Sequence, residues 1–309
     1  MWIRSLSKLV VLSTSVVFGS ITAVSAQQNA ALTPELLSSS LLQDFNGNGL
    51  IEIVAFGDSI TRGEGDFISP SSEVDESPDA SGESGYPVRI EGYLGVQVAN
   101  YGNPGESFIF GGLPRMISYL SRARPDVLII MEGSNDARLP ASAPIYHRAF
   151  QTAINVARAL GVKILIGTVP PVCCGHQFLS GPIDTYNPVL RALAPVNDVA
   201  LADINKAFTN TCGNVASCRL LNRPEGLHPN ILGHDVIGEN MVAAILNIDL
   251  LAPGGPALLE QALGLAPGSI HTVPDAAPVA KASGTSASQD PLVTDPLSAD
   301  PFAETVMIP

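Results

Sequence analysis

The feature that most constrains the fold is a regular alternation of short apolar runs and amphipathic stretches between residues 44 and 250. The apolar runs are rich in β-branched residues, which is typical of buried strands. Helical spacing of apolar residues occurs between them. This alternation predicts an α/β fold whose sheet is mostly parallel, with helices on both faces. The expected strands are 50–55, 96–99, 126–131, 162–169 and 199–204, and the expected helices are 113–122, 143–160, 183–193 and 231–248.

The first 26 residues have the pattern of a secretory signal peptide. Arg4 and Lys8 precede an apolar stretch, and Val24-Ser25-Ala26 offers the small residues that a signal peptidase requires. An N-terminal membrane anchor is the alternative, but the run is short for a span and contains several hydroxyl residues. We therefore expect cleavage after Ala26 and a secreted or periplasmic protein. No later stretch is long and apolar enough to span a bilayer.

Two segments flank the alternating region. Residues 27–43 form a short leader, and residues 251–309 form an acidic tail rich in Ala, Pro and Ser. One or two helical turns are expected within 258–263, and the rest of the tail is expected to be disordered because its composition cannot form a core. A single domain over residues 44–250 remains, which is enough chain for one hydrophobic core.

The charge balance bears on the class of partner. The sequence contains 16 basic and 29 acidic residues, and loss of Arg4 and Lys8 with the signal peptide leaves a formal charge of −15. Nucleic-acid binding requires a basic surface that neutralises phosphates. The composition therefore argues against a nucleic-acid partner and leaves a small-molecule substrate as the expectation.

Four cysteines lie downstream of the predicted signal peptide. An even number of cysteines in an exported protein suggests disulfides. A bridge between the adjacent Cys173 and Cys174 would be strained, so each is expected to pair with Cys212 or Cys218, with either connectivity open. A zinc site is the weaker alternative because adjacent cysteines do not match the usual ligand spacing.

Polar motifs follow the predicted strands where each strand ends. Ser59 follows the first strand, residues 100–107 follow the second, residues 132–136 follow the third, and Glu225 and His228 lie in the loop after the fifth. The carboxyl ends of parallel strands share one edge of the sheet, where ligand sites of open α/β sheets lie. A serine, glycine-rich turns, an amide side chain and an acid–base pair would meet there, as acyl transfer requires.

These motifs resemble the blocks of the GDSL, or SGNH, hydrolase family over about residues 50–248. Gly57-Asp58-Ser59 matches the first block, Gly105 the glycine block, residues 133–136 the Gly-x-Asn-Asp block and His228-Pro229 the last block. The resemblance implies a flavodoxin-like three-layer α/β/α fold and ester hydrolysis without a cofactor or metal. It further implies that Ser59 is the nucleophile and His228 the base, with an oxyanion hole made by the Ser59 and Gly105 backbone N–H groups and the Asn135 side chain.

The chain departs from the family at the acid of the triad. The family usually has Asp three residues before the histidine, and this chain has Glu225. A glutamate can orient the imidazole and stabilise its charged form, so Glu225 is the predicted acid. The alternative is that Glu225 faces solvent and a backbone carbonyl orients His228.

Several other polar residues are assigned lesser roles. The acidic residues within 64–85 are expected to form a solvated loop that either overhangs the site or lies apart from it. His176 is a candidate for the rim of the site, whereas His147 and His234 are expected to be structural. Residues 44–52 resemble the start of an EF-hand calcium loop, but Ala55 replaces the required glutamate, so a tight turn is predicted.

The expected function is that of a secreted serine ester hydrolase acting through an acyl-enzyme intermediate on a small acyl or acetyl ester. The same fold could instead transfer the acyl group to an alcohol or sugar. A catalytically inactive binding module is a third hypothesis, which the presence of Ser59, Asn135 and His228 disfavours. The alcohol and the acyl chain length are not encoded in these motifs.

Overall fold

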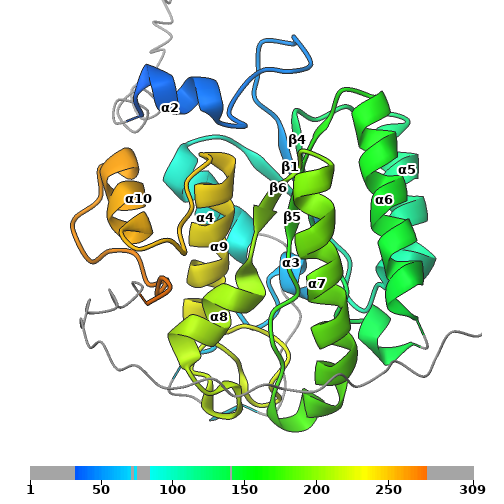
Figure 1. Cartoon of the computed structure of the whole chain (residues 1–309), viewed down its shortest axis with the longest axis vertical. Coiled ribbons are helices and arrows are strands. Elements are labelled where there is room, and N and C mark those ends of the chain that lie inside the picture. The colour runs from blue at the N-terminus through cyan, green and yellow to red at the C-terminus, as the bar shows by residue number, and fades with distance from the viewer. Residues whose placement is uncertain (1–31, 71–72, 75–83, 140, 277–309) are drawn as a thin grey trace, which may run out of the picture. The chain divides into compact units, whose positions relative to one another are not determined.

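The computed structural model describes residues 32–70, 73–74, 84–139 and 141–276 (Figure 1). The predicted signal peptide, half of the acidic segment 64–85 and the end of the tail lie outside these residues. The described part of the chain belongs to one compact unit that extends to Ala276. Among the described residues, no helix has the length and apolar character needed to cross a membrane.

A five-stranded parallel sheet forms the centre of the fold. Its spatial order is β3-β1-β4-β5-β6, and every neighbouring pair is parallel. The register places Gly57, the last residue of β1, opposite Gly102 of β3 and Met131 of β4. The carboxyl ends of these three central strands therefore lie side by side. The strands are β1 (Ile53–Gly57), β3 (Val98–Gly102), β4 (Val127–Met131), β5 (Lys163–Gly167) and β6 (Ala200–Ala202).

Alternate side chains of the central strands enter two separate cores. Ile53 and Ala55 of β1 belong to one hydrophobic cluster, whereas Val54 and Phe56 belong to the other. All five residues of β1 and of β4 are buried, which explains why the sequence shows continuous apolar runs there. Full burial of such a side chain contributes about 1.5–3 kcal/mol relative to exposure, so the central strands anchor both layers.

Helices cover both faces of the sheet, giving a three-layer α/β/α arrangement. One core is closed by α4 (Tyr86–Leu94), α8 (Ile204–Cys212), α9 (Ile231–Ile245) and α10 (Gly255–Leu263). The other is closed by α5 (Leu113–Leu120), α6 (Ala143–Ala159) and α7 (Ser180–Val196). Figure 1 shows α4, α9 and α10 together on one side of the strands and α5 and α6 on the other. The predicted fold class is confirmed.

Shorter helical segments and a second small sheet are also present, among them 3-10 turns at Asp136–Arg138, Cys174–Leu179 and Val215–Ser217. The helix α2 (Pro34–Ser39) lies in the predicted leader, α3 (Ser59–Arg62) follows β1, and a π-helical turn spans Phe108–Gly112. The strands β2 (Glu73–Val74) and β7 (Arg223–Pro224) pair in parallel. This pairing joins the segment after Ser59 to the loop that carries His228.

The packed unit is longer than the predicted domain of residues 44–250. At its start, the Leu41 backbone N–H donates to the Ile245 carbonyl, and Leu42 is buried. At its end, the buried Glu239 carboxylate accepts hydrogen bonds from the backbone N–H groups of His271 and Thr272. Segments that the composition marked as leader and tail therefore contribute to the core that contains α9.

The expected cysteine pairing is wrong. Cys212 and Cys218 are bonded to each other, with Cα atoms 4.8 Å apart, whereas Cys173 and Cys174 are free. Cys212 ends α8, and the chain turns back so that a residue six positions later reaches it. The two loops do lie together, because Cys174 Sγ is 4.0 Å from the Ala216 carbonyl oxygen.

Candidate active site

Ser59 lies at the point where β1 turns into α3. It is the first residue of α3, and the Asp58 side chain caps this helix by accepting a hydrogen bond from the Ile60 backbone N–H. The preceding Gly57 has no room for a side chain, since a Cβ there would lie 1.9 Å from Thr61 Oγ1 and 2.6 Å from the Met131 carbonyl oxygen. In the Gly-Asp-Ser sequence, the glycine is therefore required by the lack of space, and the aspartate caps the helix that Ser59 begins.

The structure brings Ser59, His228 and Glu225 together in a line. Ser59 Oγ is 2.8 Å from His228 Nε2, and His228 Nδ1 is 3.1 Å from Glu225 Oε1. The other Glu225 oxygen accepts the backbone N–H groups of Leu227 and His228, each at 2.9 Å. The side chain of Glu225 is only 9% exposed, so it does not face solvent as the alternative hypothesis required. The extra methylene of glutamate is accommodated by a turn that folds the carboxylate back under the imidazole.

The pKa values of this pair move apart. Burial alone would raise the pKa of Glu225, but hydrogen bonds from His228 and from the Leu227 backbone lower it below its usual value. Burial alone would lower the pKa of His228, but its contacts with Glu225 and with Glu64 raise it to about 9. The resting site therefore favours an imidazolium held by carboxylates.

His176 contacts the predicted acid. Its Nδ1 lies 2.9 Å from the Glu225 carbonyl oxygen and 3.2 Å from Glu225 Oε1. The other two histidines considered in the sequence lie elsewhere. His147 is exposed on α6, and His234 is buried on α9, where its Nε2 lies 3.1 Å from the Glu64 carbonyl oxygen.

Besides Ser59, the predicted oxyanion-hole residues lie in the loops that follow the two strands flanking β1. Gly105 follows β3 with a φ of +75°, which favours glycine, and a Cβ there would meet no heavy atom within 4 Å. Asn135 follows β4, and its Nδ2 lies 3.4 Å from Asp58 Oδ2. Both residues are therefore at the carboxyl edge of the sheet that carries Ser59.

The buried carboxylate of Asp136 connects these two flanking loops. Asp136 Oδ1 accepts hydrogen bonds from the Ser107 hydroxyl at 2.8 Å and the Ile109 backbone N–H at 3.0 Å. Its Oδ2 accepts the Phe108 backbone N–H at 2.8 Å. The residue after Asn135 thus fixes the turn that follows Gly105.

A second group of acidic side chains lies beneath Ser59. Burial raises the pKa of Asp58 to about 6, against the opposing hydrogen bond from Ile60 and the charge of His228. Burial also raises the pKa of Glu132 well above its usual value, and the nearby Asp58, Glu106 and Asp136 carboxylates add to this effect. Neither carboxyl oxygen of Glu132 has a hydrogen-bond partner. Glu132 is consequently held in its neutral form.

The expectation of a fully solvated acidic loop is wrong for its first residues. Glu64 and Asp66 are 7% and 8% exposed. Glu64 Oε2 lies 3.1 Å from His228 Nε2, and Asp66 accepts hydrogen bonds from the Gly85 backbone and from Arg89. Sequence reasoning missed Glu64. The available signal was its position between Gly63 and Gly65 just after a helix, which indicates an ordered turn.

The segment that resembles a calcium loop forms a tight turn. Asp44 accepts backbone N–H groups from Gly47, Asn48 and Gly49, and Asn48 Nδ2 donates to Glu52 at 2.7 Å. Within the described residues, no group of three or more His, Cys, Asp or Glu side chains is placed to hold a metal ion.

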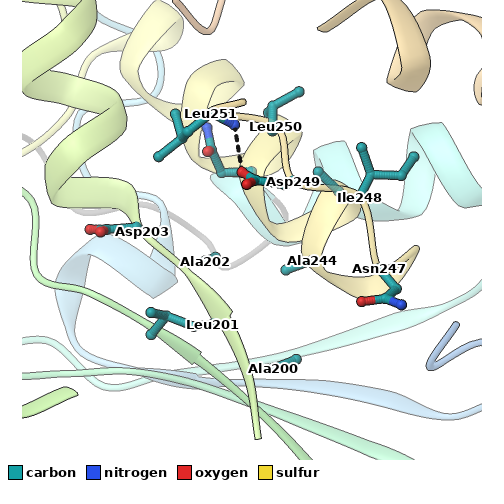
Figure 2. A pocket seen from close by; sticks show the side chains of 12 residues that line it. Ala200, Leu201, Ala202, Asp203, Ala244, Asn247, Ile248, Asp249, Leu250 and Leu251 are labelled. Carbon is teal, nitrogen blue, oxygen red and sulfur yellow. Dashed lines mark hydrogen bonds between the residues drawn. The ribbon is translucent and has the colours of Figure 1, made fainter. Parts of the chain in front are cut away.

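A cavity of about 250 Å³ lies at the edge strand β6, away from these residues. Figure 2 shows its walls, formed by β6 and by the segment that follows α9, where Asp249 accepts a hydrogen bond from the Leu251 backbone N–H at 3.2 Å. None of Ser59, Glu225 and His228 lines it. The cavity is therefore separate from the candidate active site.

Comparison with known proteins agrees with this geometry. The model of the GDSL-like lipase/acylhydrolase family matches residues 55–236, which include Ser59, Gly105, Asn135, Glu225 and His228. The chain belongs to this family. Family membership makes it a carboxylic ester hydrolase. No curated protein shows a significant match to the chain.

A solved lipase/acylhydrolase structure shares the fold, and two further solved structures are similar to the chain. The lipase/acylhydrolase from Enterococcus faecalis is 22% identical, with a TM-score of 0.52, and the alignment covers 64% of this chain and 96% of that one. A lipolytic G-D-S-L family protein from Veillonella parvula is 21% identical, with a TM-score of 0.49 and coverages of 62% and 96%. An acetyl xylan esterase from Geobacillus stearothermophilus is 21% identical, with a TM-score of 0.47 and coverages of 63% and 94%.

Proposed function

We propose that this family member is an exported serine ester hydrolase that acts through an acyl-enzyme intermediate on a small acyl or acetyl ester. The observation that carries the proposal is the continuous set of contacts from Ser59 Oγ to His228 Nε2 and from His228 Nδ1 to Glu225. Acyl transfer requires a nucleophile that is hydrogen-bonded to a base, and a buried acid that orients this base.

The reaction follows from these contacts. Ser59 Oγ attacks the ester carbonyl carbon while His228 Nε2 accepts the hydroxyl proton, and Glu225 stabilises the imidazolium that forms. The negative charge on the carbonyl oxygen faces the backbone N–H groups of Ser59 and Gly105 and the Asn135 amide. The carbon–oxygen bond to the alcohol then breaks, and the alcohol leaves with the proton from His228. Water attacks the acyl-Ser59 ester with His228 as base and releases the acid.

Export is a separate part of the proposal. It is supported by the basic and apolar pattern of residues 1–26, with small residues before the proposed cleavage site after Ala26. N-terminal sequencing of the protein recovered from the medium or periplasm tests it. A mature chain starting at Gln27 is expected, and an intact chain in the membrane fraction would overturn it.

A fluorophosphonate probe tests the nucleophile directly. The wild-type protein is expected to be labelled on the peptide that contains Ser59, and to hydrolyse p-nitrophenyl acetate. Ser59→Ala should lose both properties, whereas Ser118→Ala, which changes an exposed serine on α5, should retain both. Esterase turnover by Ser59→Ala equal to that of the wild type would overturn the assignment. Product analysis with an added alcohol would separate hydrolysis from acyl transfer.

A further inference from the structure

Glu64 makes a contact that conflicts with the simple triad. Its Oε2 lies 3.1 Å from His228 Nε2, the same nitrogen that lies 2.8 Å from Ser59 Oγ. A carboxylate can only accept hydrogen bonds, so it binds Nε2 when that nitrogen carries a proton. A general base must present an unprotonated Nε2 to the serine hydroxyl. The contact with Glu64 and the role of His228 as base therefore require opposite protonation states of the same atom.

The position of Glu64 is built into the fold. Its backbone N–H donates to the Ser59 carbonyl at 3.0 Å, and its own carbonyl lies 3.1 Å from His234 Nε2. The next residue, Gly65, packs so closely on the other loop that a Cβ there would lie 2.2 Å from the Pro229 carbonyl oxygen and 3.3 Å from His228 Cβ. The turn after α3 and the His228 loop are thus in direct backbone contact, which places Glu64 beside the imidazole.

The remaining charges around His228 do not replace this contact. Glu225 lies on the opposite nitrogen, and the more distant Asp58 at the start of α3 also interacts electrostatically with His228. His234 on α9 faces the backbone of Glu64, and burial lowers its pKa to about 4, so it stays neutral in the working pH range. Beyond it, Arg89 forms ion pairs with both Asp66 and Asp235. Glu64 is the carboxylate in contact with Nε2 among the described residues.

We propose that Glu64 is a positioning residue that holds His228 as an imidazolium and so sets the pH above which Ser59 becomes reactive. This inference rests on the proposed function of His228 as the base. The same contact stabilises the imidazolium that forms in the transition state, and this makes His228 a stronger base once it has lost its proton. Glu64 therefore lowers activity at neutral pH, where His228 is protonated, and raises the rate at alkaline pH, where His228 is a free base.

The pH dependence of kcat/KM tests the proposal. In Glu64→Gln, the midpoint of the acidic limb is expected to fall by about one pH unit or more, because an opposite charge in contact shifts a pKa by that amount. The plateau at alkaline pH is expected to be lower than in the wild type. Glu35→Gln, which neutralises an exposed glutamate on α2, should leave the whole profile unchanged. A uniform loss of activity with an unmoved midpoint would assign Glu64 to packing alone and overturn the proposal.

A second measurement is independent of turnover. The imidazole of His228 can be titrated by NMR in Ser59→Ala and in the double variant Ser59→Ala/Glu64→Gln, neither of which needs to react. A lower pKa of His228 in the double variant is expected, and equal values in both proteins would overturn the proposal. Absence of esterase activity in the wild type, together with a shifted His228 titration, would contradict the proposed function but support the contact with Glu64.

Discussion

Two groups of buried acidic side chains lie near Ser59, and the pKa values of their carboxyl groups shift in opposite directions. In the first, Glu225 and Glu64 contact the two nitrogens of His228, and the pKa of Glu225 is lowered. In the second, Glu132 has no hydrogen-bond partner and its pKa is raised. Burial disfavours the charged carboxylate in both regions, so the difference comes from the partner that each fold position supplies. The fold thus keeps the pKa of Glu225 low by facing it with donors, and leaves Glu132 without one.

The largest expected effect is a loss of activity on neutralising Glu225, the acid of the charged region. Glu225→Gln should lower kcat/KM at least about 100-fold, because the amide cannot stabilise the imidazolium that forms when Ser59 loses its proton. Steady-state kinetics on p-nitrophenyl acetate measures this. A loss of less than about tenfold would mean that backbone groups alone orient His228, and that the charge of Glu225 is dispensable.

The charged region should also make stability depend on pH. The pKa of His228 is raised from 6.5 to about 9 in the folded protein, so its contribution is complete below pH 6.5 and is lost as the pH rises through 9. The contribution is roughly 3 kcal/mol at most, because each tenfold change in proton affinity corresponds to about 1.4 kcal/mol. The difference in unfolding free energy between the wild type and His228→Asn should shrink between about pH 6 and pH 10. A difference that stays constant over this range would contradict the raised pKa.

The contact between the Glu64 turn and the His228 loop can be weakened by one methyl group. Gly65→Ala should destabilise the protein by about 2 kcal/mol or more, because the added Cβ would collide with Pro229 and Asn222. Gly49→Ala is the matched control, since both glycines have a φ of +88° and a Cβ at Gly49 meets no heavy atom within 4 Å. Denaturant unfolding of both variants measures the difference. Equal losses would show that backbone strain, and not the close approach, is responsible.

The smallest effect is expected in the neutral region. Glu132→Gln replaces a neutral carboxyl group with a neutral amide of nearly the same shape, so activity near neutral pH should stay within about twofold and stability within about 1 kcal/mol. Kinetics and thermal unfolding, run beside Glu225→Gln, measure this contrast. A large loss of activity would show that Glu132 is charged and needed for the reaction.

The sequence predicted the sheet and the family well, because both follow from local patterns. The central strands β1 and β4 are buried on both faces, and continuous apolar runs report that directly. Strand ends were less accurate, as in the first strand, which was expected at residues 50–55 and lies at Ile53–Gly57. Leu50 is exposed because it belongs to the turn before the strand, where its backbone N–H donates to Asn48 Oδ1, and hydrophobicity alone cannot show this.

Other features depend on contacts between distant segments. The helices α3, α4 and α8 were not expected, because glycine, threonine and asparagine within or beside them obscure the helical period. The packing of residues 251–276 depends on the buried Glu239, and composition alone suggested a disordered tail. Glu64 was placed in a solvated loop because its partner, His228, lies 164 residues later in the chain.

The carboxylate of Asp136 couples the two loops that carry the proposed oxyanion-hole residues Gly105 and Asn135. Asn135 precedes Asp136 in the sequence, and the turn after Gly105 is hydrogen-bonded to the two carboxylate oxygens of Asp136. A change in either loop is therefore transmitted to the other across one buried side chain. Exchanging loops between relatives to alter substrate preference requires moving residues 103–112 and 132–138 together. Either loop moved alone would lose the hydrogen bonds that join the two loops through Asp136.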